Sequence, residues 1–248
     1  MIAANRLRGP SAARAGAHHP LREEAALPVE GIRLWLVDLD EPAPEEARPW
    51  LSASEQERST RFVFARDARR YRVAHVALRR LLFLYGGVPA GVEFEIGAHG
   101  KPRLAGGEGC GFNLSHSGAV ALIGIGPGEG IGVDLEVLHD IDDVWPLAEQ
   151  NFTMGEYEAL RRTPNVDVAR AFLRGWTRKE ACLKAVGSGL SIAPASFEAG
   201  LCAQSRIAAL TTERGPVDVR VQSVELGDGM LSAVARTVHP PPPSSCRR

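Results

Sequence analysis

Hydrophobic and polar positions along the chain predict a mixture of strands and amphipathic helices. Residues 31–39 alternate between apolar and polar well enough to form a first strand, and residues 217–221 alternate plainly near the other end. Ser52 and Glu55 have the capping-box spacing that starts a helix. A second, longer helix is expected over about residues 67–85. Its buried stripe is formed by Val73, Val76, Ala77, Leu81 and Leu84.

The same order of elements recurs in the second half of the chain. Thr153 and Glu156 repeat the capping-box pattern about a hundred residues later. A helix, a break at Pro164 and a long helix over residues 172–186 follow, and Gly187 stands where a glycine ends a helix. The intervening strands are expected at residues 92–96, 119–125 and 130–136. We therefore expect an α+β fold built from a duplicated unit.

The chain divides into four segments on composition. Residues 1–28 are expected to be a disordered leader, which we prefer over an organelle transit peptide, because the stretch lacks the apolar core of a secretion signal. Residues 29–128 and 129–238 are expected to form an N-terminal and a C-terminal α+β subdomain, the second of which contains the candidate metal and catalytic motifs described below. Residues 239–248, with four consecutive prolines, are expected to be a disordered tail.

Composition excludes several classes of protein. The apolar fraction of 44% and the net charge of −1 fit a globular protein whose overall field recruits neither nucleic acid nor an anionic membrane. No apolar run approaches the ~20 residues that span a bilayer. The cysteines are widely spaced, which indicates reduced thiols in a cytoplasmic protein instead of a disulfide framework or a zinc site. They are Cys110, Cys182, Cys202 and Cys246.

Asp134 and Glu136 lie two residues apart on a predicted strand, so their side chains share one face, with Cα atoms roughly 7 Å apart. On an exposed strand such a pair carries no meaning. Here the flanking residues are apolar, and two carboxylates ~4 Å apart inside a protein repel by about 4 kcal/mol at an effective dielectric near 20. A divalent cation would offset this repulsion, and oxygen-only ligands favour Mg²⁺ over zinc.

Trp176, Glu180 and Lys184 recur every four residues of the long helix and line one face. They form either simple packing with an ion pair, or one wall of a site in which Glu180 is a third carboxylate that binds metal or accepts a proton. Lys179 and Lys184 would then contact phosphate, although Lys179 is equally a candidate for a solvated lysine.

Two further features suggest an anion site. His116, in a serine-rich loop, either caps the loop or donates to a phosphate. Asp67 is the only acidic residue between Arg58 and Arg80, so the arginines there either have distant acid partners or bind phosphate. The residues alone thus predict a Mg²⁺-dependent enzyme acting on a phosphate or pyrophosphate.

Three motifs, in order, resemble a known family. They are F-N-L-S-H-S-G at 112–118, G-V-D-L-E at 132–136 and W-T-R-K-E-A-C-L-K-A-V-G-S-G-L at 176–190. This set resembles the Sfp-type 4′-phosphopantetheinyl transferases. The resemblance spans about residues 31–238 and includes S-x-x-E-x-x-R-x-x-R-F at 52–62 and Gly100-Lys101-Pro102. Each motif alone is weak or moderate, but the three in this order and spacing are highly specific.

The resemblance implies a fold of two similar α+β subdomains in an intramolecular pseudo-dimer, present as a monomer. It also implies transfer of the phosphopantetheine arm of coenzyme A to a serine of an apo acyl or peptidyl carrier protein, releasing adenosine 3′,5′-bisphosphate. Asp134, Glu136 and Glu180 look like ligands of Mg²⁺, or of Mn²⁺. Asp134, Glu180 and Lys184 would be catalytic, with Glu180 a candidate base and Lys184 on the pyrophosphate.

By the same resemblance, a group of residues matches positions that bind coenzyme A. These are Arg58, Arg61, Arg70, Lys101, Ser115, His116, Lys179 and Lys184. One basic position of some relatives falls here on Glu55 or Gln56, so Arg70 is the firmer assignment. Two alternatives are a catalytically inactive relative that binds coenzyme A or a carrier, and a different Mg²⁺ phosphoesterase. The intact carboxylates and Lys184 argue against the first, and the intact 112–118 motif argues against the second.

Overall fold

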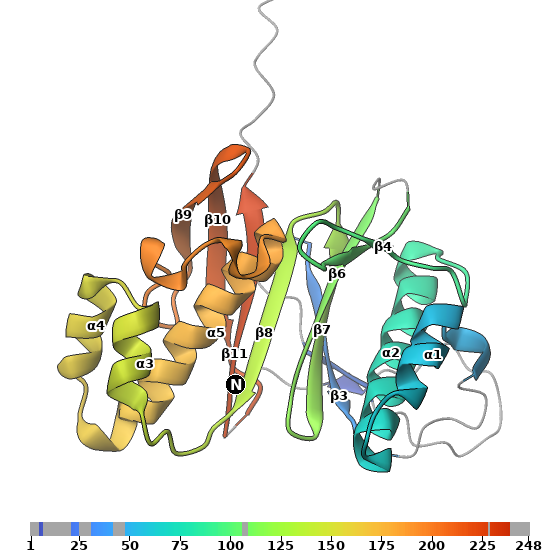
Figure 1. Cartoon of the computed structure of the whole chain (residues 1–248), viewed down its shortest axis with the longest axis horizontal. Helices are drawn as coiled ribbons and strands as arrows, with labels where there is room; N and C mark the ends of the chain where they lie inside the picture. The colour runs from blue at the N-terminus through green and yellow to red at the C-terminus, as the bar shows by residue number, and fades with distance from the viewer. Residues whose placement is uncertain are drawn as a thin grey trace, which may run out of the picture.

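Two α+β halves lie side by side in the protein (Figure 1), which confirms the predicted fold class. The structure is a computed structural model that describes residues 5–6, 21–24, 31–41, 48–105, 109–227 and 229–238. The expected C-terminal tail and most of the expected leader lie outside the described residues.

The N-terminal half is built on a five-stranded sheet. Its order is β1 (Asn5–Arg6), β2 (Leu21–Glu24), β3 (Arg33–Asp38), β7 (Val120–Pro127) and β6 (Cys110–Ser117). Strand β2 pairs antiparallel with β3. The prediction of a disordered leader over residues 1–28 is therefore wrong for β1 and β2, because their backbones join the sheet. Without a long apolar alternation, these strands gave no signal in the sequence.

Helix α2 (Ala65–Gly86) packs on this sheet, and α1 (Ala53–Thr60) packs on α2. Both hydrogen bonds of the capping box predicted at Ser52 are present. Most of the predicted α2 stripe is buried, but Leu84 is 62% exposed, so its inclusion was wrong. The strand expected at 92–96 is reduced to β4 (Glu95–Ile96), which pairs with β5 (Pro102–Arg103).

The C-terminal half has a four-stranded antiparallel sheet and three helices. The strand order is β8 (Ile131–Val137), β11 (Met230–Val238), β10 (Gly215–Val224) and β9 (Arg206–Thr212). The helices are α3 (Val144–Asn151), α4 (Met154–Arg161) and α5 (Val168–Val186). Short 3₁₀ turns are η1 (Arg48–Trp50), η2 (Asn165–Asp167), η3 (Gly189–Ser191) and η4 (Pro194–Ser196). Gly187 ends α5 in the left-handed conformation, as predicted.

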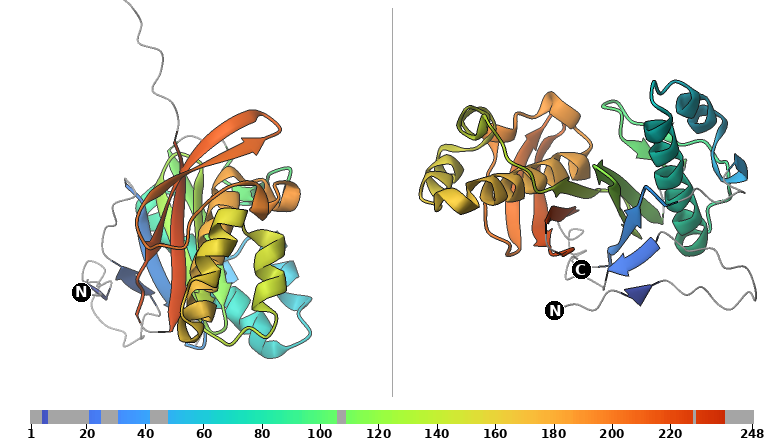
Figure 2. Two further views of the ribbon diagram at one scale, coloured as in Figure 1. Left: turned by 90° about the vertical axis from the view of Figure 1, so that its left-hand side faces the viewer. Right: turned by 90° about the horizontal axis from the view of Figure 1, so that it is seen from below.

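Four apolar clusters of described residues hold together the layers that Figures 1 and 2 show. One of these clusters joins α3 and α4 to α5 within the C-terminal half. The other three lie against the sheets. One lies between α2 and the N-terminal sheet, and a second lies between α5 and the C-terminal sheet. The third lies between the two sheets, where Leu34 and Leu122 of the N-terminal half meet Val133 and Leu135 of β8. Burial of apolar surface between the sheets therefore fixes β8 beside the N-terminal half.

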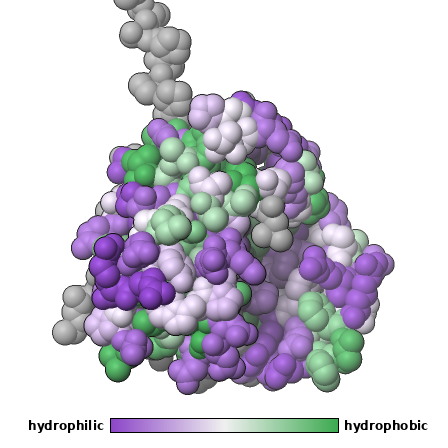
Figure 3. All heavy atoms as spheres, turned by 60° about the vertical axis from the view of Figure 1, so that its left-hand side comes forward, coloured by the Kyte–Doolittle hydropathy of each residue, from purple (hydrophilic) through white to green (hydrophobic). Residues whose placement is uncertain are grey.

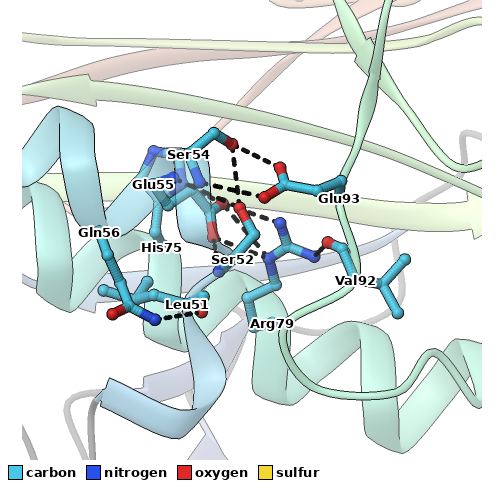
Figure 4. A network of polar contacts seen from close by, with 9 residues as sticks. All are labelled: Leu51, Ser52, Ser54, Glu55, Gln56, His75, Arg79, Val92 and Glu93. Carbon is cyan, nitrogen blue, oxygen red and sulfur yellow. Dashed lines mark hydrogen bonds and ion pairs between the residues drawn. The ribbon is translucent and has the colours of Figure 1, made fainter.

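The two halves repeat one buried polar arrangement. In the first half, Glu55 of the capping box accepts hydrogen bonds from Arg79, which is 1% exposed (Figure 4). In the second half, Glu156 of the other capping box pairs with Lys179, which is fully buried, at 2.7 Å. In both halves, a glutamate three residues after the cap holds a cation of the following long helix. This shared arrangement supports a duplicated unit.

Candidate active site

Strand β8 places two carboxylates against helix α5. The alternation of β8 directs Val133 into the core between the sheets and Gly132, Asp134 and Glu136 to the opposite face. Gly132 is required by close packing, because a Cβ atom there would lie 2.0 Å from the carbonyl oxygen of Ala181 in α5. The predicted shared face of Asp134 and Glu136 is therefore the face that meets α5.

Lys184 of α5 forms an ion pair with Asp134. The Nζ atom of Lys184 lies 2.5 Å from Oδ1 of Asp134 and 3.1 Å from Oγ of Ser115. The hydroxyl of Ser115, on β6, donates to the same Oδ1 at 2.8 Å. Within the described residues, the ion pair of Lys184 is thus with Asp134 and not with Glu180. Three elements, from both halves of the chain, meet at one carboxylate oxygen.

Residues 112–118, expected as a loop, belong mostly to strand β6, so that expectation was wrong. Alternate side chains of β6 point toward β8: Asn113 accepts from the backbone N–H of Val133 at 2.8 Å, and Ser117 donates to Glu136 at 2.7 Å. Partial burial of the imidazole and the charge of Lys184 lower the pKa of His116. A strand, with its fixed alternation, therefore orders the polar side chains of the motif along the junction between the halves.

Asp134 is buried and Glu180 is partly buried, and their negative charges repel each other. Burial raises the pKa of Asp134, although Lys184 and Ser115 favour its charged form. Burial, followed by the negative charge of Asp134, raises the pKa of Glu180. The Oδ2 atom of Asp134 is buried and has no hydrogen-bond partner. A buried, unpartnered carboxylate oxygen among acidic neighbours fits a cation with oxygen ligands.

The case for a metal ion rests on the unpartnered Oδ2 atom of Asp134 and its acidic neighbours, and not on a complete set of protein ligands. Among the described residues, no three His, Cys, Asp or Glu side chains are gathered closely enough to hold a metal ion as they stand. Mg²⁺ commonly keeps several waters and takes only one or two carboxylates together with substrate phosphates. The residues present are compatible with that mode of binding.

Lys179 lies elsewhere, and its expected contact with coenzyme A is withdrawn. Its ammonium is fully buried in the C-terminal half. It pairs with Glu156 and donates to the carbonyl oxygens of Pro194 at 2.7 Å and Phe197 at 2.6 Å. An ammonium has three donors, and all three are used. Lys179 therefore holds α4 and the chain after α5 in place, and the alternative of a solvated lysine is equally wrong.

Of the arginines predicted to bind phosphate, Arg70 is paired with an acidic residue that is distant in the sequence. Asp40 accepts two hydrogen bonds from Arg70, both at 2.8 Å, and the pKa of Asp40 is lowered chiefly by this contact. Arg70 also donates to the carbonyl oxygen of Gly118, at the turn that follows β6. Asp40 lies thirty residues before Arg70 and carries no motif, so sequence reasoning missed it.

The remaining two arginines, Arg58 and Arg61, are exposed at the C-terminal end of α1. Arg61 pairs with Glu57 one turn earlier in α1, and the guanidinium of Arg58 lies 5.7 Å from the ring centroid of Tyr71. Both guanidinium groups remain accessible to an anion, because their contacts are on the surface.

Lys101 connects the two halves. Its Nζ atom donates to the carbonyl oxygens of Ile131, at 2.9 Å, and Ala185, at 3.1 Å, at the start of β8 and the end of α5. Burial lowers the pKa of Lys101 to about 8. The ammonium of Lys101, which was expected to contact coenzyme A, is thus bonded to the protein backbone. Lys101 and the neighbouring Pro102 also line a cavity.

That cavity has a volume of about 850 Å³ and lies at the end of the junction between the halves. Its walls come from the β4–β5 turn, the start of β6, the end of α5 and the β9–β10 hairpin. Lining residues include Lys101, Pro102, Phe112, Gly187 and Val217. Figure 3 shows the surface hollowed between the halves, with mainly hydrophilic residues around the hollow. The volume is in the range of small-molecule sites.

Comparison with known proteins identifies the class to which this fold and site belong. Residues 130–235 match the profile of the 4′-phosphopantetheinyl transferase superfamily, and residues 43–126 match that of the 4′-phosphopantetheinyl transferase N-terminal domain. The chain therefore belongs to the 4′-phosphopantetheinyl transferases, a family of enzymes, which confirms the resemblance of its motifs.

Individual relatives agree with this assignment. The chain is 39% identical to the 4′-phosphopantetheinyl transferase HetI of Nostoc sp. over 166 residues, which cover 64% of this chain and 70% of that protein. It is 32% identical to psf-1 of Bacillus pumilus, over 63% of this chain and 66% of that protein. The match to ffp of Bacillus subtilis, at 28% identity, covers 84% of this chain and 95% of that protein.

In the part of the chain that the structure describes, no helix is long and apolar enough to cross a membrane.

Proposed function

We propose that the protein transfers the 4′-phosphopantetheine arm of coenzyme A to a serine of an apo acyl or peptidyl carrier protein, and so acts as a holo-[acyl-carrier-protein] synthase. The observation that carries the proposal is that Ser115 and Lys184 both contact Oδ1 of Asp134. The other oxygen of this carboxylate, Oδ2, has no partner, and the charge of Glu180 lies nearby. A cation, a base and oxygen ligands at one junction are what transfer from a pyrophosphate requires.

Coenzyme A would lie in the hollow between the halves. Lys184, Ser115 and His116 would contact its pyrophosphate, and the backbone around Lys101 would line the cavity at the end of the junction. Arg58, Arg61 and Arg70 would serve its further phosphate, since guanidinium groups suit phosphate geometry. Because Arg70 is held by Asp40, it would act from a fixed position.

Asp134, Glu136 and Glu180 would hold Mg²⁺, or Mn²⁺, together with water and the pyrophosphate. The ion, when bound, would neutralise charge that develops on the pyrophosphate. Glu180 would accept the proton of the carrier serine, and its raised pKa suits a base near neutral pH. The serine oxygen then bonds to phosphorus as the bond to the bridging oxygen breaks, and Lys184 would stabilise the departing adenosine 3′,5′-bisphosphate.

The nucleophile would belong to the partner protein. The chain itself then needs no activated serine or cysteine. We further propose that the enzyme acts as a monomer in the cytoplasm on carrier domains of fatty-acid, polyketide or nonribosomal peptide synthases. The last two would place it in secondary metabolite biosynthesis.

The experiment is incubation with coenzyme A, Mg²⁺ and apo carrier proteins from each of the three synthase classes. Intact-mass spectrometry then detects the added phosphopantetheine. Modification of at least one carrier supports the proposal. No modification of any carrier, with coenzyme A binding retained, would instead support an inactive binding relative. Hydrolysis of coenzyme A without transfer would indicate a phosphoesterase.

A further inference from the structure

Strands β6 and β8 lie side by side at the junction but belong to different sheets. Side chains of β6 make hydrogen bonds to β8 in register: Asn113 to Val133, and Ser117 to Val137 and Glu136. Hydrogen bonds from polar side chains of β6 thus contribute to the contact between the two halves.

Ser117 makes two bonds at once. Its Oγ atom accepts from the backbone N–H of Val137 at 3.2 Å and donates to Oε2 of Glu136 at 2.7 Å. The first bond occupies a lone pair of the hydroxyl, and the second directs its hydrogen at the carboxylate. Glu136 is only partly buried, so without Ser117 its flexible side chain could turn toward solvent.

The orientation of Glu136 matters to the other carboxylates. The charge of Glu136 contributes to the raised pKa of both Asp134 and Glu180, so the three groups share one electrostatic site. Ser115, two residues before Ser117 on the same face of β6, donates to Asp134 in the matching way. The N-terminal half therefore supplies one hydroxyl to each of the two β8 carboxylates.

We propose that Ser117 is a positioning residue that holds the Glu136 carboxylate in the orientation needed to bind the divalent cation. The inference rests on the proposed function, because that function supplies the cation. Its consequence is that affinity for the metal depends on the contact between the two halves, and not on the C-terminal half alone. Residues that orient a metal ligand typically change metal affinity about 10–100-fold when they are removed.

The test measures Mn²⁺ binding by electron paramagnetic resonance, with coenzyme A present and no carrier protein. Ser117→Ala is expected to weaken Mn²⁺ binding about tenfold, and Ser117→Thr, which keeps the hydroxyl, is expected to restore most of it. Ser232→Ala is the matched control: it removes a buried serine whose hydroxyl donates to the carbonyl oxygen of Val224 at 2.8 Å, a backbone partner instead of a carboxylate. Its Mn²⁺ affinity should equal that of the wild type.

A second arm asks whether Ser117 acts through Glu136. If it does, Ser117→Ala should cause no further loss of Mn²⁺ affinity in a Glu136→Gln background. This comparison holds even if one variant is less stable, because binding is measured on folded protein. Wild-type affinity in Ser117→Ala, or an equal loss in both backgrounds, would overturn the inference alone. A wild-type protein that binds no Mn²⁺ would overturn the proposed metal site and the inference with it.

Discussion

The ammonium of Lys184 lies 2.5 Å from the carboxylate of Asp134, and so joins the last turns of α5 to the middle of β8. The nearby lysine favours the charged form of Asp134, but the carboxylate is only 4% exposed. Burial outweighs the attraction of the lysine, so the pKa of Asp134 is raised. The pair leaves Oδ2 of Asp134 without a partner. The pair is therefore not a fully satisfied structural ion pair, and this supports the cation site proposed above.

Replacement of Lys184 by methionine should lower kcat/KM about 10²-fold, because the charge on the pyrophosphate loses a fixed cation in the transition state. Lys184→Arg, which keeps the charge in a different geometry, should fall between the two. Steady-state kinetics with a carrier protein measures both. Equal activity of the methionine variant and the wild type would remove Lys184 from the site.

Lys179→Met should destabilise the fold by about 3–5 kcal/mol, because it leaves Glu156 buried without its cation. Urea unfolding measures this loss. Coenzyme A binding by the protein that remains folded should be unchanged. A variant of normal stability with weakened coenzyme A binding would show that the original assignment of Lys179 to the ligand was right.

Asp40→Asn should raise the KM for coenzyme A severalfold with little change in kcat or in stability. The neutral amide of the variant cannot hold the guanidinium of Arg70 with two charge-assisted bonds, so Arg70 becomes mobile. The matched control is Asp67→Asn, which removes the exposed partner of Arg66 on the same helix. A KM that is unchanged by Asp40→Asn, or raised equally by the control, contradicts this role.

Lys101→Met tests the connection between the halves through its pH dependence. The pKa of Lys101 in the folded protein, about 8, is below its value in the unfolded chain. Between the two values the unfolded chain binds the extra proton, so this group makes the wild type more stable as pH rises from about 8 towards 10.5. The difference in unfolding free energy between wild type and variant should therefore shift in favour of the wild type from pH 7 to pH 9.5. A difference that is constant with pH would place the ammonium in water.

Sequence reasoning reached the parts of the site that are close in sequence or follow a regular period. Strand alternation defines one face, with Gly132, Asp134 and Glu136. Helical spacing defines a second face, with Glu180 and Lys184, and the structure brings the two faces together. The α+β class and both capping boxes were likewise predictable, because local hydrogen bonds determine helix starts.

Contacts between distant segments were not predictable in the same way. Asp40 and Arg70, or Glu156 and Lys179, meet only because sheets and helices pack, and nothing local in the sequence indicates either pair. The burial of Lys179 is hidden for the same reason, so neither its motif position nor its charge indicates that it pairs with Glu156. The sequence of β6 resembles that of a loop, because polar residues alternate along this strand toward the other half instead of toward solvent.

The most direct measurement is the intact mass of an apo carrier protein after incubation with coenzyme A and Mg²⁺, with either the wild type or Glu180→Gln. The wild type should add one phosphopantetheine, and Glu180→Gln, which should still bind coenzyme A, should add almost none. A variant that modifies the carrier at the wild-type rate would contradict the central role given to Glu180 opposite Asp134 and Glu136.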